Sequence, residues 1–210
     1  MSLFPTWMPR ERITDLGARL AVGVLFLFLS VNLLADFQRT QRVTGLLLLV
    51  SEALVVVLTV VRRRAQSVDH SAVAAITTTL SMAGPPLLRA GDETALMRDD
   101  ATALLSIAGL CLVIAGKLAL GRSFGLLPAS RGTVTVGPYL LMRHPIYTGY
   151  LITHVAFLTA HPTVLNLAVL ILADGALVVR ALIEERMLKR DERYRAYCSR
   201  VGWHLVPGVF

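Results

Sequence analysis

Charged residues are scarce in this chain. Asp, Glu, Lys and Arg make up 17% of its 210 residues, whereas soluble globular domains contain about a quarter. Hydrophobic residues make up 55% of the chain, and the mean hydropathy is +0.63. This composition excludes an ordinary soluble domain. We therefore expect an integral membrane protein with little chain left for a separate soluble catalytic domain.

Cysteine is almost absent, with two residues in the whole chain. Cys111 lies inside an apolar run and Cys198 in a charged segment, so the pair has neither metal-ligand spacing nor a disulfide pattern. We expect both to be inert thiols. Acidic residues are also few, 14 against 21 basic ones, but the basic residues flank apolar runs instead of forming one patch. This pattern favours lipid headgroups and membrane topology over nucleic acid as the reason for the positive charge.

Long apolar runs are what the sequence has in abundance. The first run follows charged residues without a clear small-residue cleavage site, which indicates a retained helix and not a signal peptide. The last apolar stretch is interrupted by His161 and Pro162, so two helices joined by a tight turn fit it better than one long helix. The predicted spans cover residues 16–35, 43–61, 71–88, 101–120, 146–160 and 163–183.

The positions of the basic residues test this layout, because cytoplasmic flanks of membrane spans are enriched in Lys and Arg. If the amino terminus is cytoplasmic, all but four of the 21 basic residues fall on the cytoplasmic side. The four exceptions are Arg39, Arg42, Arg89 and Arg98. We therefore expect both termini in the cytoplasm.

The predicted fold class is all-α, a polytopic membrane helical bundle of about six spans. The last two spans would form a hairpin, followed by a short cytoplasmic helix and tail. Residues 1–120 would form a four-helix membrane region, and residues 121–210 would carry the functional site. We expect the two regions to be integrated into a single domain.

Polar residues interrupt the apolar pattern at residues 137–149, which read GPYLLMRHPIYTG. Pro145 suits the first position of a helix, where its missing N–H would have no partner in any case. The free N–H groups of that helix start and the forked cation of Arg143 would together hold an anionic or polar ligand. Gly149 would permit close backbone approach. The alternative is that Arg143 and His144 only snorkel at the membrane surface.

A second polar segment, residues 178–197, reads VVRALIEERMLKRDERYRAY at the end of the last span. Arg180 and Glu184 are four residues apart and share a helix face. The carboxylate and the guanidinium could between them bind an amino-acid-like ligand and an acidic substrate. The alternative is an ordinary ion pair on a helix beside the membrane.

The two segments together resemble a known family. GPY at residues 137–139, RHPxYxG at 143–149, EExxL at 184–188, and the pair Tyr194 and Tyr197 with a final Pro207 are similar to the isoprenylcysteine carboxyl methyltransferase and phospholipid methyltransferase group of integral membrane enzymes. LGRSFG at residues 120–125 also fits its bacterial members. The resemblance covers roughly the carboxyl-terminal half of the chain.

This resemblance implies S-adenosyl-L-methionine as cofactor, held between the last two helices and closed by the tail. Arg180 would orient the carboxylate of the substrate. Gly202 and His204 stand where basic residues are expected in bacterial relatives. The implied cofactor-binding residues are Arg131, Gly132, Thr133, Val134, Tyr139, Arg143, His144, Pro145, Ile146, Tyr147 and Glu184.

The implied activity is methyl transfer to a lipophilic small molecule or a lipid at the cytoplasmic face. A carboxylate acceptor needs no general base, whereas an amine must lose a proton. Near Arg180 the implied site offers no base other than His144, which we expect to contact the cofactor. This favours carboxyl methylation of an isoprenylcysteine-like or other lipophilic acid. Phospholipid amine N-methylation, an NADPH-dependent reductase of the steroid-reductase type and a non-catalytic accessory protein remain alternatives. The sequence leaves the acceptor and the oligomeric state open.

Ionisable residues lie within several predicted spans, among them Glu52, His154, Asp174 and Lys117. Glu52, in the middle of the second span, would be costly as a lone carboxylate, so we expect it to be protonated or paired, with an interhelical hydrogen bond favoured over a substrate contact. His154 and Asp174 lie in the last two spans. They would face each other only if both turn toward the middle of the hairpin.

Overall fold

The chain is described by a computed structural model over residues 10–41, 45–46, 49–50, 53, 56–57, 67–68, 71–91, 93–123, 129–130 and 133–210. Within these residues it is almost entirely helical, which confirms the predicted all-α class. The α-helices are α1 (Arg10–Thr40), α3 (Ala72–Leu87), α4 (Asp99–Leu120), α5 (Pro145–Ala160), α6 (Val164–Leu188) and α7 (Glu192–Cys198). The short elements are the 3-10 helices η1 (Gly121–Ser123) and η2 (Gly137–Leu140) and the strands β1 (Ser67–Val68) and β2 (Ala129–Ser130), which pair antiparallel.

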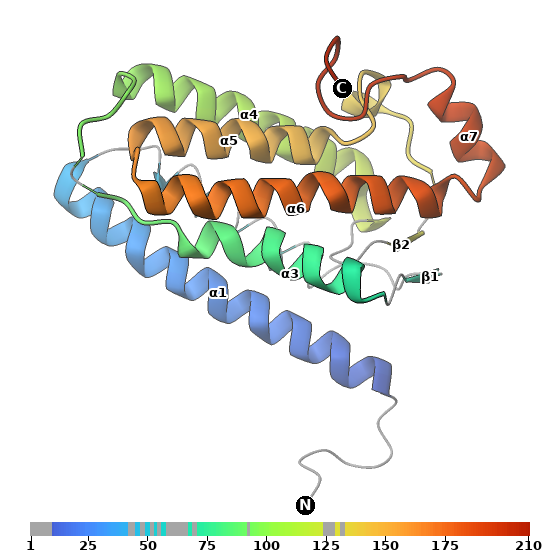
Figure 1. Cartoon of the computed structure of the whole chain (residues 1–210), viewed down its shortest axis with the longest axis horizontal. Coiled ribbons are helices and arrows are strands. Elements are labelled where there is room, and N and C mark those ends of the chain that lie inside the picture. Colours follow the sequence, from blue (N-terminus) through green and yellow to red (C-terminus); the bar gives the residue numbers. More distant parts are fainter. Residues whose placement is uncertain are drawn as a thin grey trace, which may run out of the picture.

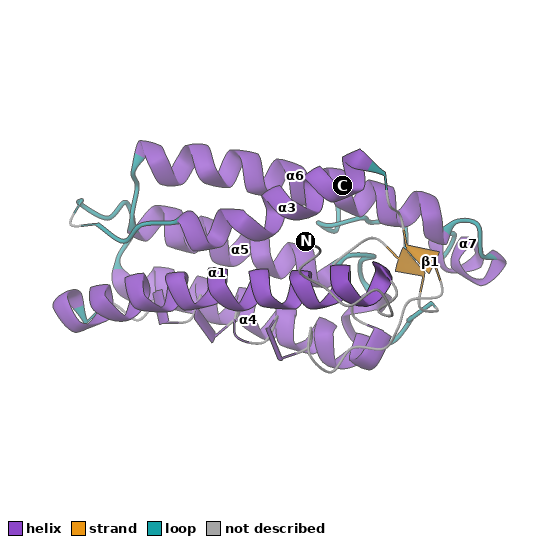
Figure 2. Cartoon of the chain, turned by 90° about the horizontal axis from the view of Figure 1, so that it is seen from below, coloured by secondary structure: helices purple, strands orange, loops and turns teal. Residues whose placement is uncertain are grey.

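The helices α3, α4, α5 and α6 run side by side, and α1 crosses them obliquely (Figure 1). The connections from α3 to α4 and from α5 to α6 lie at one end of the bundle. The elements η2, α7 and β1 lie at the other end, which we call the tail end, and Figure 2 shows the same arrangement from below. The first turn of α5 and the last turns of α6 therefore meet at the tail end.

The boundaries of α5 and α6 follow from local sequence signals. Pro145 occupies the first turn of α5, as predicted. The predicted break is also confirmed, because α5 ends at Ala160 and α6 begins at Val164. Thr163 caps the new helix through its hydroxyl oxygen, which accepts the N–H of Asn166 at 2.9 Å. A proline and a cap thus separate two helices in an apolar stretch that hydropathy alone would merge.

Two of the described helices, α4 and α6, are long and apolar enough to cross a membrane by length and composition. The prediction of six spans goes further than this. The helices α3 and α5 have 16 residues each, fewer than the roughly 20 that a straight span needs. The predicted second span, with Glu52, lies largely outside the described residues.

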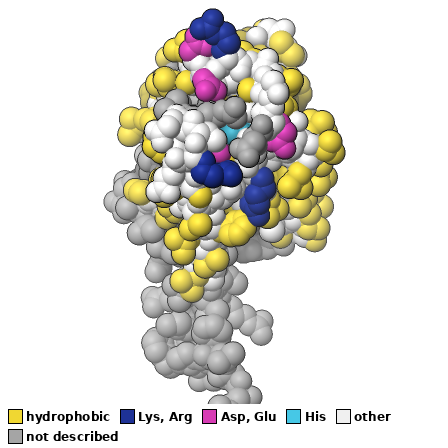
Figure 3. All heavy atoms as spheres, turned by 90° about the vertical axis from the view of Figure 1, so that its left-hand side faces the viewer, with side chains coloured by type: hydrophobic (Ala, Val, Ile, Leu, Met, Phe, Trp, Pro, Cys, Tyr) yellow, Lys and Arg dark blue, Asp and Glu magenta, His cyan; other side chains and the backbone are white. Residues whose placement is uncertain are grey.

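The surface separates apolar flanks from a charged end. Figure 3 shows the end opposite the tail end, where acidic and basic side chains lie on the end face and hydrophobic side chains cover the flanks. Large apolar side chains along the helices are strongly exposed, among them Leu118 on α4 at 75% and Ile171 on α6 at 64%. Such a distribution suits a bundle that is surrounded by lipid along its sides and by water at its ends.

The helices pack as two close pairs, α4 with α5 and α3 with α6. In the first pair, a Cβ added to Gly149 would lie 2.6 Å from the Gly109 carbonyl oxygen, and one added to Gly109 would lie 2.7 Å from the Gly149 oxygen. The close approach predicted at Gly149 is confirmed. In the second pair, a Cβ added to Gly84 would collide with the Ala173 side chain. Small residues thus let the backbones of each pair touch, as is common between helices in membranes.

The substitution Gly149→Ala tests this packing. The added methyl group would collide with backbone atoms of Gly109 and Val113, so α4 and α5 must separate. We expect a loss of about 1–3 kcal/mol in the free energy of unfolding, measured by thermal unfolding in detergent. The control is Gly175→Ala on α6, where the described part of the chain has no atom within 4 Å of the added Cβ. A Gly149→Ala protein as stable as the control would contradict the interpretation.

Candidate functional site

The chain segment before α5 and the tail, residues 199–210, lie against each other at the tail end. The Arg143 N–H donates to the Trp203 carbonyl oxygen and the His144 N–H to that of His204, both at 2.9 Å. One turn into α5, the Thr148 hydroxyl donates to the Leu205 carbonyl oxygen at 2.8 Å. The tail therefore covers the start of α5 through main-chain contacts.

Glu185, near the end of α6, is the centre of these contacts. Its side chain is 2% exposed, and a buried carboxylate is tolerated only when it is paired. The Arg143 guanidinium donates to it at 2.9 Å, and nitrogens of His144 and His204 approach it at 3.2 and 2.6 Å. Lys189, one turn further along the helix, adds its ammonium at 3.3 Å. Glu185 thus joins α6, the segment before α5 and the tail.

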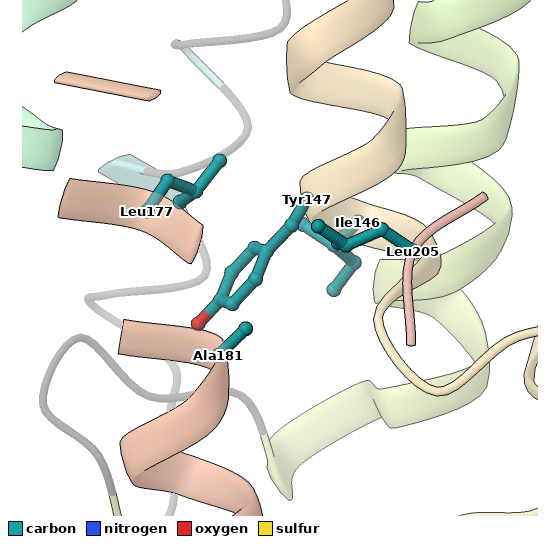
Figure 4. Packing of buried hydrophobic residues seen from close by; sticks show 5 residues of the cluster. All are labelled: Ile146, Tyr147, Leu177, Ala181 and Leu205. Carbon is teal, nitrogen blue, oxygen red and sulfur yellow. The ribbon is translucent and has the colours of Figure 1, made fainter. Parts of the chain in front are cut away.

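Glu184, its neighbour, faces a different group of residues. The Tyr147 hydroxyl donates to Glu184 at 2.7 Å, and the Arg180 Nε donates to the same oxygen at 3.2 Å. Arg180 and Glu184 therefore share a helix face, as predicted, and they form the ion pair that the sequence analysis gives as the alternative to ligand binding. The Arg180 guanidinium also lies 5.4 Å from the centre of the Tyr147 ring. Figure 4 shows Tyr147 reaching from α5 toward α6, with its hydroxyl next to Ala181.

His144 lies between the two carboxylates. Its Nε2 is 3.2 Å from Glu185, and its Nδ1 is 4.0 Å from Glu184. The imidazole stacks on the Tyr147 ring with the planes 5° apart. The site therefore combines an aromatic stack, a buried guanidinium and a carboxylate that is not fully buried, since the Glu184 side chain is 19% exposed.

Tyrosines from η2 and α7 form a second layer beside the site. Tyr139, Tyr194, Tyr197 and Val201 are buried together, and Val134 packs against them. The Tyr197 hydroxyl donates to the Tyr139 carbonyl oxygen at 2.7 Å. Burial raises the pKa of Tyr197 to about 12 and also raises the pKa of Tyr139 and Tyr194. All three hydroxyls therefore stay protonated at physiological pH, and the Tyr197 hydroxyl serves as a hydrogen-bond donor.

The structure brings most of the predicted site residues to the tail end, but it gives some of them other contacts. The Arg143 guanidinium, expected to hold a ligand, donates to Glu185 and to the carbonyl oxygens of Val201 and Cys198 at 2.8 and 3.1 Å. Pro145 and Ile146 lie against α4, where a Cβ added to Gly116 would meet both. Thr133 lies in the segment that leads to η2. Arg131 and Gly132 lie outside the described residues.

Sequence reasoning missed the role of Glu185 and of His204. Glu185 was visible only as the second acid of the EExxL pattern, and consecutive helical residues point about 100° apart, so the pair had to face two directions. His204 was noted only as a departure from expected basic residues. In the structure its imidazole makes the shortest contact with the Glu185 carboxylate. The position of His204 in the sequence could not indicate this contact.

The thiols and the ionisable pair in the bundle are also placed. Cys111 is exposed on α4, and Cys198 is half-buried. Burial raises the pKa of the Cys198 thiol, which lowers its reactivity. His154 and Asp174 both turn toward the middle of the hairpin, and their side chains are 2.6 Å apart.

Comparison with known proteins adds no family assignment: no protein-family model matches the chain, and no curated protein matches it. The resemblance of its motifs to the membrane methyltransferases stays a prediction. The contacts described above stand independently of it.

The substitution Glu185→Gln tests whether this carboxylate holds the tail. It would leave the Arg143 guanidinium facing a neutral group, and breaking a buried ion pair costs about 3–5 kcal/mol. We expect faster proteolytic cleavage within residues 199–210 and a lower unfolding temperature. Glu192→Gln, at an exposed position of α7, is the control. Equal cleavage rates in the two variants would show that Glu185 does not hold the tail.

Proposed function

We propose that this chain is an integral membrane enzyme that transfers a methyl group from S-adenosylmethionine to a lipophilic acceptor at the cytoplasmic face. The favoured acceptor is a carboxylate, as in carboxyl methylation of an isoprenylcysteine-like or other lipophilic acid. The observation that carries the proposal is the shared contact of Tyr147 and Arg180 with Glu184. These three residues belong to the two motif segments, and they meet although the segments are far apart in the sequence.

The chemistry of the donor set fits the cofactor. A carboxylate such as Glu184 pairs with the ammonium of an aminoacyl group, and the stacked rings of His144 and Tyr147 offer a face to a planar heterocycle. The buried layer around Tyr139 and Val134 continues this surface toward α7. Bound there, S-adenosylmethionine would supply an electrophilic methyl group.

The chain's own residues would bind and orient. Arg180, 6% exposed, would hold an acceptor carboxylate with its planar fork. Such an acceptor is already ionised, so no residue has to take a proton from it. Alignment of two bound reactants can supply roughly 7–11 kcal/mol of the barrier. The tail, fixed by Glu185, would exclude water from the aligned pair.

The membrane placement belongs to the same proposal. Six spans with cytoplasmic termini would put the tail end in the cytoplasm of a bacterial inner membrane. The support is the charge distribution: near the tail end lie Arg143, Arg180, Arg186, Lys189, Arg190, Arg193, Arg195 and Arg200. In the loop between α3 and α4, at the opposite end, basic and acidic residues are mixed. Basic residues mark the cytoplasmic side of membrane proteins.

Calorimetric binding of S-adenosylhomocysteine to the purified chain in detergent tests the proposal. We expect binding by the parent protein. Glu184→Gln should bind about tenfold more weakly or worse, because it loses a charge-assisted hydrogen bond. Glu93→Gln, exposed in the loop between α3 and α4, is the matched control and should bind like the parent.

Failure of the parent to bind S-adenosylhomocysteine would reject the proposal, and binding of NADPH in its place would favour a reductase. Transfer of labelled methyl groups to headgroup amines but not to lipophilic acids would assign phospholipid N-methylation instead. Unchanged binding by Glu184→Gln would remove Glu184 from the site.

A further inference from the structure

An ionisable pair joins α5 and α6 in the apolar middle of the bundle. The Nδ1 of His154 is 2.6 Å from the Asp174 carboxylate, and the two side chains are 3% and 22% exposed. Apolar residues surround both in the sequence, with Ala156 and Phe157 following His154 and Leu170 to Ala173 preceding Asp174. Ionisable groups are rare and costly at such depth, and where they occur they usually serve a function.

One nitrogen of this pair is left without a partner. Asp174 as a carboxylate can only accept, so the Nδ1 of His154 must donate to it, and the neutral imidazole then carries a lone pair on Nε2. The His154 Nε2 is buried and has no hydrogen-bond partner among the described residues. A buried acceptor without a donor is unfavourable. The geometry therefore calls for a hydrogen-bond donor at this nitrogen.

On α5, the pair lies on the same helix face as the candidate site. On α5, Tyr147, Tyr150 and His154 follow one another at spacings of three and four residues, which places them on one face. On α6, Asp174 lies six residues before Arg180, which turns the two side chains about 120° apart, so the common face belongs to α5. The two helices are joined at both levels, by Tyr147 with Glu184 at 2.7 Å and by His154 with Asp174 at 2.6 Å.

The two levels are separated by a distance that helix geometry fixes. Seven residues of helix between Tyr147 and His154 correspond to about 10 Å along the axis. The Tyr150 ring lies between them and stacks on His154 with 6.2 Å between ring centres. An aromatic surface thus connects the Arg180 level to the His154 level.

The deeper level is accessible from the side of the bundle. The Asp174 side chain is partly exposed, and next to it on α6 no atom of the described residues lies within 4 Å of a Cβ added to Gly175. The helices α5 and α6 also pack less extensively against each other than against α4 and α3. A molecule dissolved in the bilayer can therefore approach the pair along this seam.

We propose that His154 and Asp174 form a second subsite for the methyl acceptor, which binds a hydroxyl group about 10 Å from the carboxylate held by Arg180. The acceptor hydroxyl donates to the His154 Nε2, and Asp174 fixes the imidazole in the tautomer that accepts it. This inference rests on the proposed function. It narrows the substrate class to long lipophilic acids that carry a hydroxyl in the middle of the chain.

Calorimetry with three probes tests the subsite. The probes are a long-chain saturated fatty acid with a mid-chain hydroxyl, the isomer with its hydroxyl next to the carboxylate, and the acid without a hydroxyl. The parent protein should bind the first about three- to tenfold more tightly than the others, the gain of one buried hydrogen bond. S-adenosylhomocysteine binding is measured on every protein in parallel.

Two variants remove the subsite in different ways. His154→Phe keeps an aromatic ring but loses the acceptor nitrogen, and Asp174→Asn removes the carboxylate that orients it. Both should bind the three acids equally and keep the parent's affinity for S-adenosylhomocysteine. Cys111→Ala, at an exposed position of α4, is the control and should keep the preference for the mid-chain hydroxyl.

The outcomes separate the two proposals. Equal binding of the three acids by the parent, or a preserved preference in His154→Phe, would overturn the subsite while S-adenosylhomocysteine binding keeps the proposed function. A hydroxyl preference that depends on His154, without S-adenosylhomocysteine binding, would reject the proposed function and leave a hydroxyl-binding site. If neither variant folds, the parent's own preference decides.

Discussion

The burial of one carboxylate, that of Glu185, determines how the tail end is assembled. An ionised group with 2% exposure requires partners that together replace its hydration. Arg143, His144 and His204 supply them from two segments that are more than 50 residues apart. If these partners moved away, the buried charge would be left unpaired. The start of α5, the end of α6 and the tail therefore form one unit.

The internal pairing of Glu185 explains why the adjacent acids Glu184 and Glu185 have different roles. The Glu185 carboxylate is fully paired with groups of the same chain. Its neighbour Glu184 points about 100° away around the helix, toward Tyr147 and Arg180. Glu184 keeps partial exposure, so it can exchange its internal partners for a ligand. The guanidinium of Arg143 belongs to the structural half of this arrangement, since its donors are used by Glu185, Val201 and Cys198.

The parts of the fold that depend on neighbouring residues were predictable from the sequence. Apolar runs located α4 and α6, Pro162 located the break before α6, and the four-residue spacing located the contact of Arg180 with Glu184. The partners of Glu185 were not predictable, because they depend on how the tail folds back and not on spacing. The His154–Asp174 contact depended on the rotation of two helices about their axes, which composition leaves undetermined. The second predicted span lies largely outside the described residues.

The close contacts of small residues, Gly109 with Gly149 between α4 and α5 and Gly84 with Ala173 between α3 and α6, have a mechanical consequence. Helices whose backbones touch resist sliding, because any shift creates overlap along the whole contact. We therefore expect each helix pair to move as a rigid body. The two pairs are joined between α5 and α6 by side-chain contacts that can break and re-form. Opening would then be a sliding of one helix pair past the other. Spin-label distances between α4 and α6 that never change on ligand binding would argue against such a movement. The side-chain contacts between α5 and α6 would be the first to change in such a movement.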